Sequence, residues 1–392
     1  MKCFVAVVVL LGVTFCHAAD RYGIVYAFPK GANEGAGHES IGPLIVGSVL
    51  YGATRTGGAA GKGTLFRIHT DGANFQLLHE FGCDPADGSR PCGTLVADDG
   101  TLYGMTSAGG TGNGRNGTIF RIRPDGSDYK ILHHFEGWHL DGDTPYGSLL
   151  LDHGRLYGLT PRGGPHDAGV MFRINTDGTG FGLLYAFAGG TADGATPYGS
   201  LTADNDYFYG MTSAGGSRNR GIVFRLGKNG GDYKILHQFT GGYDNGSTPY
   251  GSLLVHGEHL YGMTFAGGLA NKGTIFRLRK DGTGFTLLHS FSDNGSGGSR
   301  PQGGLVLYNG HLYGVTRTGG RNECGVLFRL ALDGQPFSLL RCFADPSNHL
   351  TKDDVSEPYG VVAIHDNALY GLARRGGKGA GGGVFRYELS VP

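Results

Sequence analysis

The sequence carries no excess of either charge. Lys plus Arg and Asp plus Glu each number 33 in 392 residues, so the formal net charge is zero when the histidines are neutral. General polyanion-binding proteins carry a surplus of basic residues, and the balance argues against that class. We therefore expect no nucleic-acid partner, while a local basic patch remains compatible with the neutral total.

Long apolar runs are missing beyond the first residues. The chain opens with Lys2, an apolar stretch from Phe4 to Phe15, and small residues at a cleavage point. This order predicts a secretory signal peptide over residues 1–19, whose apolar part is too short to span a bilayer well. Lipidation of Cys16 is less favoured, because Phe15 stands where a small residue is expected. We expect a secreted protein without a membrane span, in an extracellular, periplasmic or cell-surface setting.

Cysteine is scarce. After the leader, four remain: Cys83, Cys92, Cys324 and Cys342. An even number in an exported chain favours disulfides over buried thiols. The first two flank one short loop, and the last two lie on either side of a predicted hairpin near Asp333. We therefore expect two local bridges, Cys83–Cys92 and Cys324–Cys342.

Familiar catalytic and metal-binding signatures are also missing. The histidines and cysteines lack zinc-site spacing, and no nucleophile elbow, phosphate loop or dinucleotide fingerprint joins a strand to a helix. Loop aspartates lack the spacing of a calcium loop, and turns formed by Asp-Gly explain them more simply. We therefore predict neither a metal nor a cofactor.

Glycine is abundant, with 76 residues, and it recurs at fixed places in a repeat. A phrase of the type LYGxT occurs seven times at spacings of 52 to 57 residues. Its copies begin at Leu50, Leu102, Leu156, Phe208, Leu260, Leu312 and Leu369. Each unit reads as four short strands separated by turns rich in Asp-Gly and Gly-Gly. A period near fifty with several strands per unit is typical of a β-propeller.

The two ends of the mature chain complement one another. The segment RYGIVYAF at 21–28 matches the fourth strand of the unit, and GGVFRYEL at 382–389 matches the third. Pairing them completes the last unit and removes two exposed strand edges. We therefore predict that residues 20–392 form one all-β domain, a seven-bladed β-propeller. It has four antiparallel strands per blade and is closed by the N-terminal strand pairing with the C-terminal strand.

The repeated units resemble a known family. The patterns LYG-x-T-x-x-GG, G-x-x-FR-x-x-x-DG, LLHxF and DGxTPYGSL are similar to the GloVer tandem repeats of exported bacterial proteins. This resemblance covers nearly the whole mature chain, and it implies a propeller with an extracellular or surface setting. The family implies no particular activity or catalytic residue. The double glycine is distantly similar to kelch repeats, whose tryptophan is absent here.

Breaks in the repeat mark candidate functional residues, because function is grafted on a fold at particular sites. The longer loops share one face, where binding sites are favoured. Directly after the LYGxT threonine, arginines occur in the first, sixth and seventh copies, which are neighbours in a closed ring. Such guanidinium groups suit carboxylate or sulfate, unless they pair with Asp on a solvated rim. The candidate ligand-binding arginines are Arg55, Arg162, Arg317, Arg374 and Arg375.

Loop aromatics complete the candidate site. Trp138 and Tyr243 do not repeat, and their rings suit stacking on sugars. The first hypothesis is a monomer that binds an extracellular ligand on its long-loop face, with an acidic glycan favoured over a neutral glycan or a protein. A polysaccharide lyase acting on uronic acids is the alternative, with arginine neutralising the carboxylate. Its candidate bases are Tyr250, Tyr359, His139 and His166. A structural scaffold for protein interactions is the third hypothesis.

Overall fold

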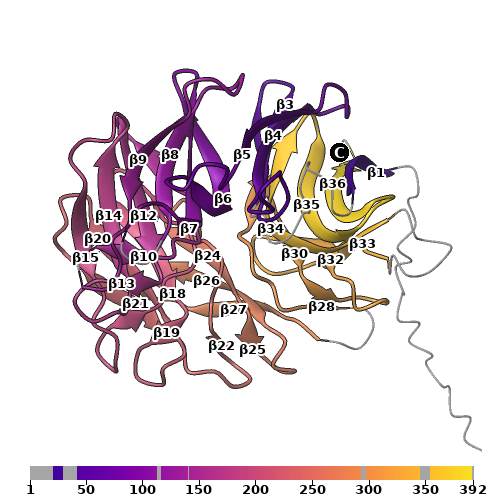
Figure 1. Ribbon diagram of the computed structural model, residues 1–392. Helices are drawn as coiled ribbons and strands as arrows, with labels where there is room; N and C mark the ends of the chain where they lie inside the picture. Colours follow the sequence, from indigo (N-terminus) through magenta and orange to yellow (C-terminus); the bar gives the residue numbers. More distant parts are fainter. Residues whose placement is uncertain are drawn as a thin grey trace, which may run out of the picture.

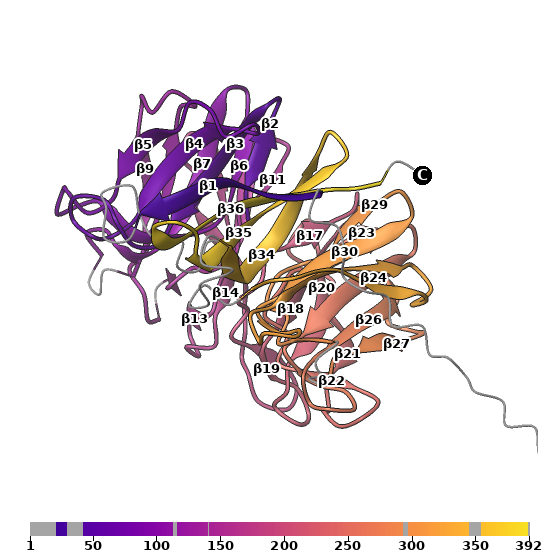
Figure 2. The ribbon, with the colours of Figure 1, turned by 90° about the vertical axis from the view of Figure 1, so that its right-hand side faces the viewer.

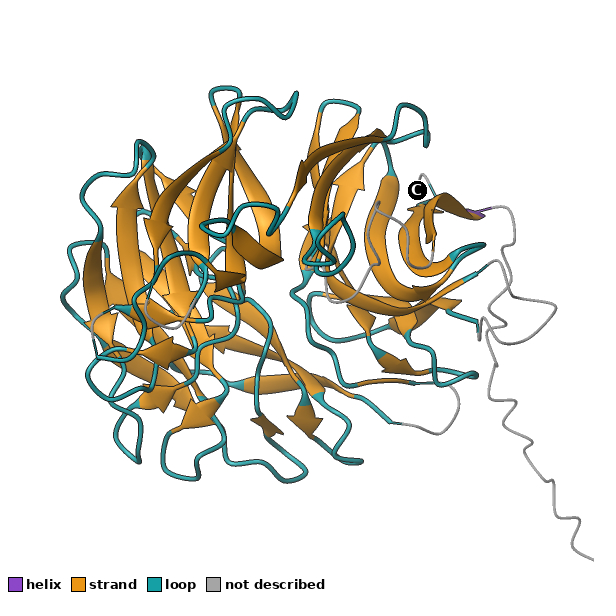
Figure 3. Cartoon of the chain, in the orientation of Figure 1, coloured by secondary structure: helices purple, strands orange, loops and turns teal. Residues whose placement is uncertain are grey.

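The computed structural model describes residues 21–29, 42–112, 116–139, 141–292, 297–344 and 354–390. The signal peptide expected over residues 1–19 lies outside this part of the chain. The regular elements are β-strands, which Figure 3 shows joined by loops of uneven length. Among the described residues, no helix has the length and apolar character needed to cross a membrane.

The described strands form seven antiparallel sheets of four strands, arranged as blades in a ring (Figure 1). Blade 1 consists of β2 (Leu44–Val46), β3 (Val49–Thr54), β4 (Thr64–His69) and β5 (Gln76–Glu80). Blade 2 consists of β6 (Gly88–Asp98), β7 (Thr101–Gly109), β8 (Thr118–Ile122) and β9 (Lys130–His134). Blade 3 consists of β11 (Leu150–Asp152), β12 (Arg155–Thr160), β14 (Val170–Asn175) and β15 (Gly182–Ala186). Blade 4 consists of β17 (Thr202–Ala203), β18 (Tyr207–Thr212), β20 (Ile222–Gly227) and β21 (Lys234–Gln238).

The remaining blades follow the same order. Blade 5 consists of β23 (Leu254–His256), β24 (His259–Thr264), β26 (Thr274–Arg279) and β27 (Thr286–Ser290). Blade 6 consists of β29 (Val306–Tyr308), β30 (His311–Thr316), β32 (Val326–Ala331) and β33 (Phe337–Cys342). Blade 7 consists of β34 (Val355–His365), β35 (Ala368–Gly376), β36 (Ala380–Glu388) and β1 (Tyr22–Pro29). The structure confirms the predicted seven-bladed propeller.

Short ribbons join the longer loops of a blade on one face. Each ribbon pairs the connection into the innermost strand with the connection after the second strand. The ribbons are β10 (Gly142–Asp143) with β13 (Arg162–Gly163), β16 (Gly194–Ala195) with β19 (Ala214–Gly215), β22 (Gly246–Ser247) with β25 (Ala266–Gly267), and β28 (Gly298–Ser299) with β31 (Thr318–Gly319). In blades 2 and 7 the long inner strands include this pairing. In blades 2 to 7 the two longer connections are therefore paired with one another on this face.

The N-terminal strand closes the ring. β1 runs antiparallel to β36, with Tyr22 opposite Tyr387, and the two strands lie side by side in Figure 2. The Tyr22 hydroxyl donates to Asp354 at 2.5 Å, and the Arg341 guanidinium lies 4.0 Å from the centroid of the Tyr22 ring. Burial, reinforced by the Asp354 charge, raises the pKa of Tyr22 well above its ordinary value. The closing strand is thus anchored by a buried, protonated phenol.

Phenylalanine pairs fill the space between blades. A phenylalanine at the end of the outermost strand of one blade, or directly after it, packs against the phenylalanine in the third strand of the next blade. The two aromatic rings meet at a steep angle. Phe81 and Phe120, for example, have ring centroids 5.4 Å apart. The contact recurs at seven junctions within the described residues, with centroid distances of 5.1 to 5.5 Å. This regular apolar spacing fixes each blade against its neighbour.

The cysteines differ from the sequence-based expectation. None of the four in the described residues is joined in a disulfide, so neither expected bridge is present. Cys92 is buried in β6, and its thiol donates to the carbonyl of Pro145 at 3.0 Å, whereas Cys83 is exposed in the preceding loop. Cys342 ends β33, and Cys324 lies in the loop before β32 with its thiol donating to a carbonyl of that loop. Cys83 and Cys92 are close in the sequence but do not meet, because Cys92 is buried in the core and Cys83 is exposed.

Glycine allows the blades to approach at the axis. Gly147, Gly199 and Gly251 occupy the same place in three successive blades. A Cβ atom at any of them would overlap the carbonyl oxygen of the glycine one blade further on. The inner circle therefore closes only when this position has no side chain.

Replacing Gly199 by alanine should lower the free energy of unfolding by about 1–3 kcal/mol, the usual cost of overpacking. The added methyl group would overlap the carbonyl of Gly251. Gly182→Ala is the matched control, because a Cβ at Gly182 meets nothing within 4 Å. Urea denaturation measures both variants, and equal stabilities would contradict the close approach at the axis.

A thiol reagent should label Cys83 in the native protein and leave Cys92 unmodified. Burial raises the pKa of the Cys92 thiol to about 12, so the reactive thiolate is absent at neutral pH. Alkylation followed by peptide mass spectrometry measures both sites, and a Cys83→Ser variant identifies the fast signal. Labelling of Cys92 at the rate of Cys83 would show that the thiol is accessible.

Candidate functional site

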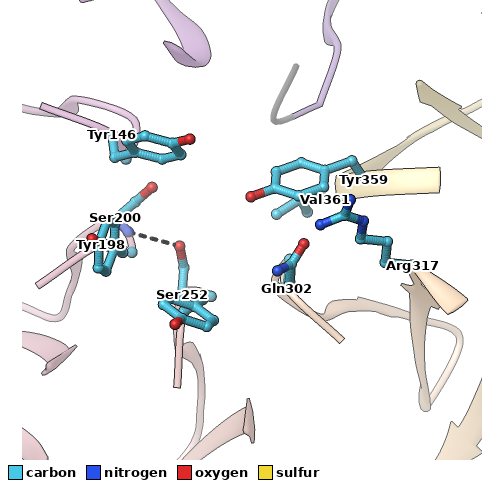
Figure 4. Close-up of a pocket in the computed structure, with 14 residues that line it drawn as sticks. Tyr146, Tyr198, Ser200, Ser252, Gln302, Arg317, Tyr359 and Val361 are labelled. Carbon is cyan, nitrogen blue, oxygen red and sulfur yellow. Dashed lines mark hydrogen bonds between the residues drawn. The ribbon is translucent and has the colours of Figure 1, made fainter. Parts of the chain in front are cut away.

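A cavity of about 220 Å³ lies on the axis of the ring. Its walls are the segments that lead into the innermost strands of blades 3 to 7, together with Arg317 from the end of β30. Figure 4 shows Tyr146 and Tyr198 on one side and Tyr359, Gln302 and Arg317 on the other. Because the walls come from five blades, no single repeat unit contains the site.

In blades 2 to 7, a left-handed residue just before the innermost strand or near its start determines where these side chains lie. Two residues before the tyrosine position, the backbone is left-handed with φ of 54° to 56°. This conformation occurs at Arg90, Thr144, Thr196, Thr248, Arg300 and Glu357. It is strained for residues other than glycine. In each of the six, the N–H donates to a loop carbonyl of the preceding blade, as from Thr196 to Ala168 at 2.8 Å, and this bond holds the turn.

Aromatic rings form an arc along one half of the cavity mouth. Tyr146, Tyr198 and Tyr250 meet edge to face, with centroid distances of 5.5 and 5.3 Å. Tyr250 continues the arc to Phe265 at 5.3 Å. Burial, and then the neighbouring Tyr198, raise the pKa of Tyr250, so this phenol is a hydrogen-bond donor at neutral pH. The arc therefore presents ring faces and edges with hydroxyl groups attached.

The other half of the mouth is rich in arginine. The carboxylate of Glu357 is contacted by Arg375 at 3.1 Å, by Arg374 at 3.3 Å and by Arg317 at 3.4 Å. Three guanidinium groups share one carboxylate, so this cluster has a formal charge of +2. The side chain of Glu357 is 15% exposed, and that of Arg375 is 59% exposed. A second anion can therefore reach the cluster from solvent.

Arginines also stand at both ends of the aromatic arc. The guanidinium carbon of Arg55 lies 4.9 Å from the centroid of Tyr146. At the far end, the corresponding carbon of Arg300 lies 5.7 Å from the centroid of Phe265. Both contacts are within the range of cation–π attraction. The channel mouth thus combines an aromatic half and a cationic half that meet at two junctions.

Polar atoms lie deeper in the cavity. The Oε1 atom of Gln302 is buried and has no hydrogen-bond partner among the described residues. The N–H of Ser200 donates to the hydroxyl oxygen of Ser252 at 2.9 Å, which links two blades (Figure 4). Gln302 thus offers an acceptor to a ligand that carries a hydroxyl group.

The structure divides the sequence-predicted residues into two groups. Arg317, Tyr250 and Tyr359 line the axial cavity, and Arg55, Arg374 and Arg375 lie at its mouth. The remaining candidates do not line the cavity. They are Arg162, Trp138, Tyr243, His139 and His166. Trp138 and Tyr243 are 74% and 76% exposed in loops of different blades. His139 contacts the Pro165 carbonyl at 3.3 Å, away from the arginine cluster.

Sequence reasoning missed two residues that shape the mouth. Glu357 takes the place that threonine has in TPYG, and Gln302 takes the place of the tyrosine. Comparing the tyrosine segments position by position would have found both as breaks in the repeat. In the described residues, no group of three or more His, Cys, Asp or Glu side chains is arranged to hold a metal ion.

Solved structures similar to this one share little sequence identity with it. An oligogalacturonate lyase in complex with manganese has a TM-score of 0.51 and 11% identity, covering 88% of this chain and 86% of that chain. A chain of a nidogen/laminin complex has a TM-score of 0.48 and 16% identity, covering 81% of this chain and 98% of that chain. At 11% identity, the likeness to the lyase concerns the fold alone. No curated protein sequence matches the chain.

A family model matches most of the sequence. The Gloeobacter/Verrucomicrobia repeat matches residues 11–206 and again residues 184–353. The two matches together span six of the seven LYGxT copies. This confirms the resemblance carried by the repeated patterns. The chain belongs to the Gloeobacter/Verrucomicrobia repeat family.

Proposed function

We propose that this protein is an exported binding module that holds an acidic glycan at the mouth of its axial channel. The observation that supports this most directly is the group of three arginines on the single carboxylate of Glu357. Guanidinium groups bind carboxylate and sulfate through paired hydrogen bonds. The excess of two positive charges favours an anionic partner at this point.

The aromatic arc suits the sugar part of such a ligand. Tyr146, Tyr198 and Tyr250 offer ring faces to the apolar face of a pyranose, and their hydroxyls offer donors to its oxygens. Gln302 adds a buried acceptor within the same cavity. A free inorganic anion would use the arginines and leave this arc unused, so the arc favours a saccharide.

Export agrees with this ligand class. The leader predicted over residues 1–19 would deliver the domain to the cell surface, the periplasm or the medium, where acidic polysaccharides occur. We propose that it acts there as a monomer whose partner is a glycan. Western blotting of the medium and of cell fractions would test the location of the mature chain.

Arg317→Ala should weaken binding to polygalacturonate by about 10–150-fold, because a charge-assisted hydrogen bond contributes about 1.5–3 kcal/mol. The loss should shrink as salt is added, since screening weakens the wild-type contact as well. Isothermal titration calorimetry measures the affinity. Arg218→Ala is the control, because Arg218 is exposed on the same face over blade 4. Unchanged affinity in Arg317→Ala would discard the proposal.

A lyase is the second candidate, because Tyr250 and Tyr359 line the same cavity as Arg317. Arginine would neutralise a uronate carboxylate, and a tyrosinate would remove the neighbouring proton, with the glycosidic oxygen leaving. Since the pKa of Tyr250 is raised, its phenolate forms only in alkaline solution.

If Tyr250 is the base, lyase activity should be very low at neutral pH and rise with pH past the ordinary tyrosine value of about 10. Ultraviolet absorbance of unsaturated ends, followed over a panel of uronic polysaccharides, measures the rate. Tyr250→Phe should abolish this alkaline rise. No absorbance on any substrate up to that pH would remove the lyase hypothesis.

A further inference from the structure

A second basic cavity lies beside the channel mouth, between blades 1 and 2. Its volume is about 420 Å³, and Arg55, Lys62 and Arg90 line it. Thr56, Ser89 and the carboxylates of Asp84 and Asp87 complete its polar lining. The lining therefore carries three cationic and two anionic groups. Whether the cavity attracts an anion depends on how far neighbouring groups already compensate the charges of the two carboxylates.

The two carboxylates differ in how far their charge is already compensated. Asp87 is buried and accepts hydrogen bonds from His79 at 2.9 Å and from Tyr129 at 2.5 Å. It also accepts from the backbone N–H groups of Gly82 and Gly88. Asp84 is exposed and accepts from one backbone N–H of its own turn. Asp87 is thus engaged within the wall by four hydrogen bonds, and the lining as a whole keeps a formal charge of +1.

The backbone holds two of the cations together. The N–H of Arg90 donates to the carbonyl of Lys62 at 2.7 Å. The aliphatic stem of Lys62 packs on Gly82, where a Cβ atom would overlap it. The pair is therefore built by the same inter-blade turn that shapes the channel mouth.

Arg55 connects the second cavity with the first. It lines the cavity between blades 1 and 2, and its guanidinium also lies over Tyr146 in the wall of the axial cavity. A similar lysine–arginine pair, Lys272 and Arg300, stands between blades 5 and 6. In that blade, Phe265 occupies the position that Arg55 has in blade 1. The pair of Lys272 and Arg300 therefore lacks a third cation at that position.

The two cavities differ in volume, and this difference suits them to different parts of one ligand. The axial cavity is smaller than the roughly 300–1,000 Å³ typical of sites for drug-sized ligands, and this suits one sugar unit. The second cavity lies within that range, is open to solvent, and suits a following unit with its own anionic group.

We infer that the ligand is a chain of at least two anionic sugar units, bound by its end. The terminal unit enters the axial cavity beside Arg317, and the next anionic unit occupies the cavity lined by Arg55, Lys62 and Arg90. This inference rests on the proposed function, and it adds the direction and minimum length of the ligand.

Affinity for galacturonate oligomers of increasing length tests the inference by calorimetry. Wild-type affinity should rise from the monomer to the trimer. The double variant Lys62→Ala/Arg90→Ala should bind the trimer about tenfold more weakly, with monomer affinity unchanged. Arg218→Ala/Arg220→Ala, at two exposed arginines on the same face over blade 4, is the control and should change trimer affinity less than twofold. Thermal melting checks that both double variants are folded.

Three results would overturn the inference in distinguishable ways. If Lys62→Ala/Arg90→Ala leaves trimer affinity unchanged while Arg317→Ala lowers it, the second cavity is no subsite and the proposed function stands. If the control pair reduces trimer affinity instead, the chain runs over blade 4. If no galacturonate oligomer and no sulfated oligosaccharide of the same lengths binds, the proposed function fails as well. The same length dependence with sulfated oligomers alone supports the inference and identifies sulfate as the anion.

Discussion

At the axis, each blade meets the next through a glycine whose missing side chain leaves room for a neighbouring backbone carbonyl. Gly147, Gly199 and Gly251 show this contact in three successive blades. Since the backbones touch there, the residues just before each glycine are forced into one circle. Their left-handed turns are held by hydrogen bonds to the preceding blade, so the circle is rigid. The positions of the side chains that precede these glycines, among them the three tyrosines of the arc, follow from this close approach.

The two halves of this circle carry different kinds of side chain, aromatic on one half and cationic on the other. At equivalent places, blades 3 to 5 supply tyrosines that meet edge to face, while blade 6 supplies Gln302. Arginines from blades 6 and 7 converge on Glu357, and Arg55 from blade 1 reaches Tyr146. Seven similar units thereby produce an asymmetric mouth, because substitutions at equivalent positions leave the backbone unchanged.

Much of the fold could be predicted from the sequence, because a propeller repeats one local pattern. Alternating apolar residues and Asp-Gly turns act within a single unit, and the spare strand at 21–28 identified the closure. The site could be predicted only in part. The positions of Arg55, Arg317, Arg374 and Arg375 were found as breaks in a regular pattern. Trp138 and Tyr243 were chosen because they do not repeat and because their rings suit stacking, and their loops lie on other blades, where both rings are exposed.

The sequence by itself determined the repeat count, the strand pattern and the pairing of the two ends, since each depends on short-range order or on equivalence between units. Only the tertiary structure decided that three arginines share Glu357, that Cys92 is buried apart from Cys83, and that the basic cavity between blades 1 and 2 adjoins the axial one. Each of these depends on distances between blades. Ring closure and the glycine contacts at the axis set those distances. They cannot be derived from the sequence of a single repeat unit.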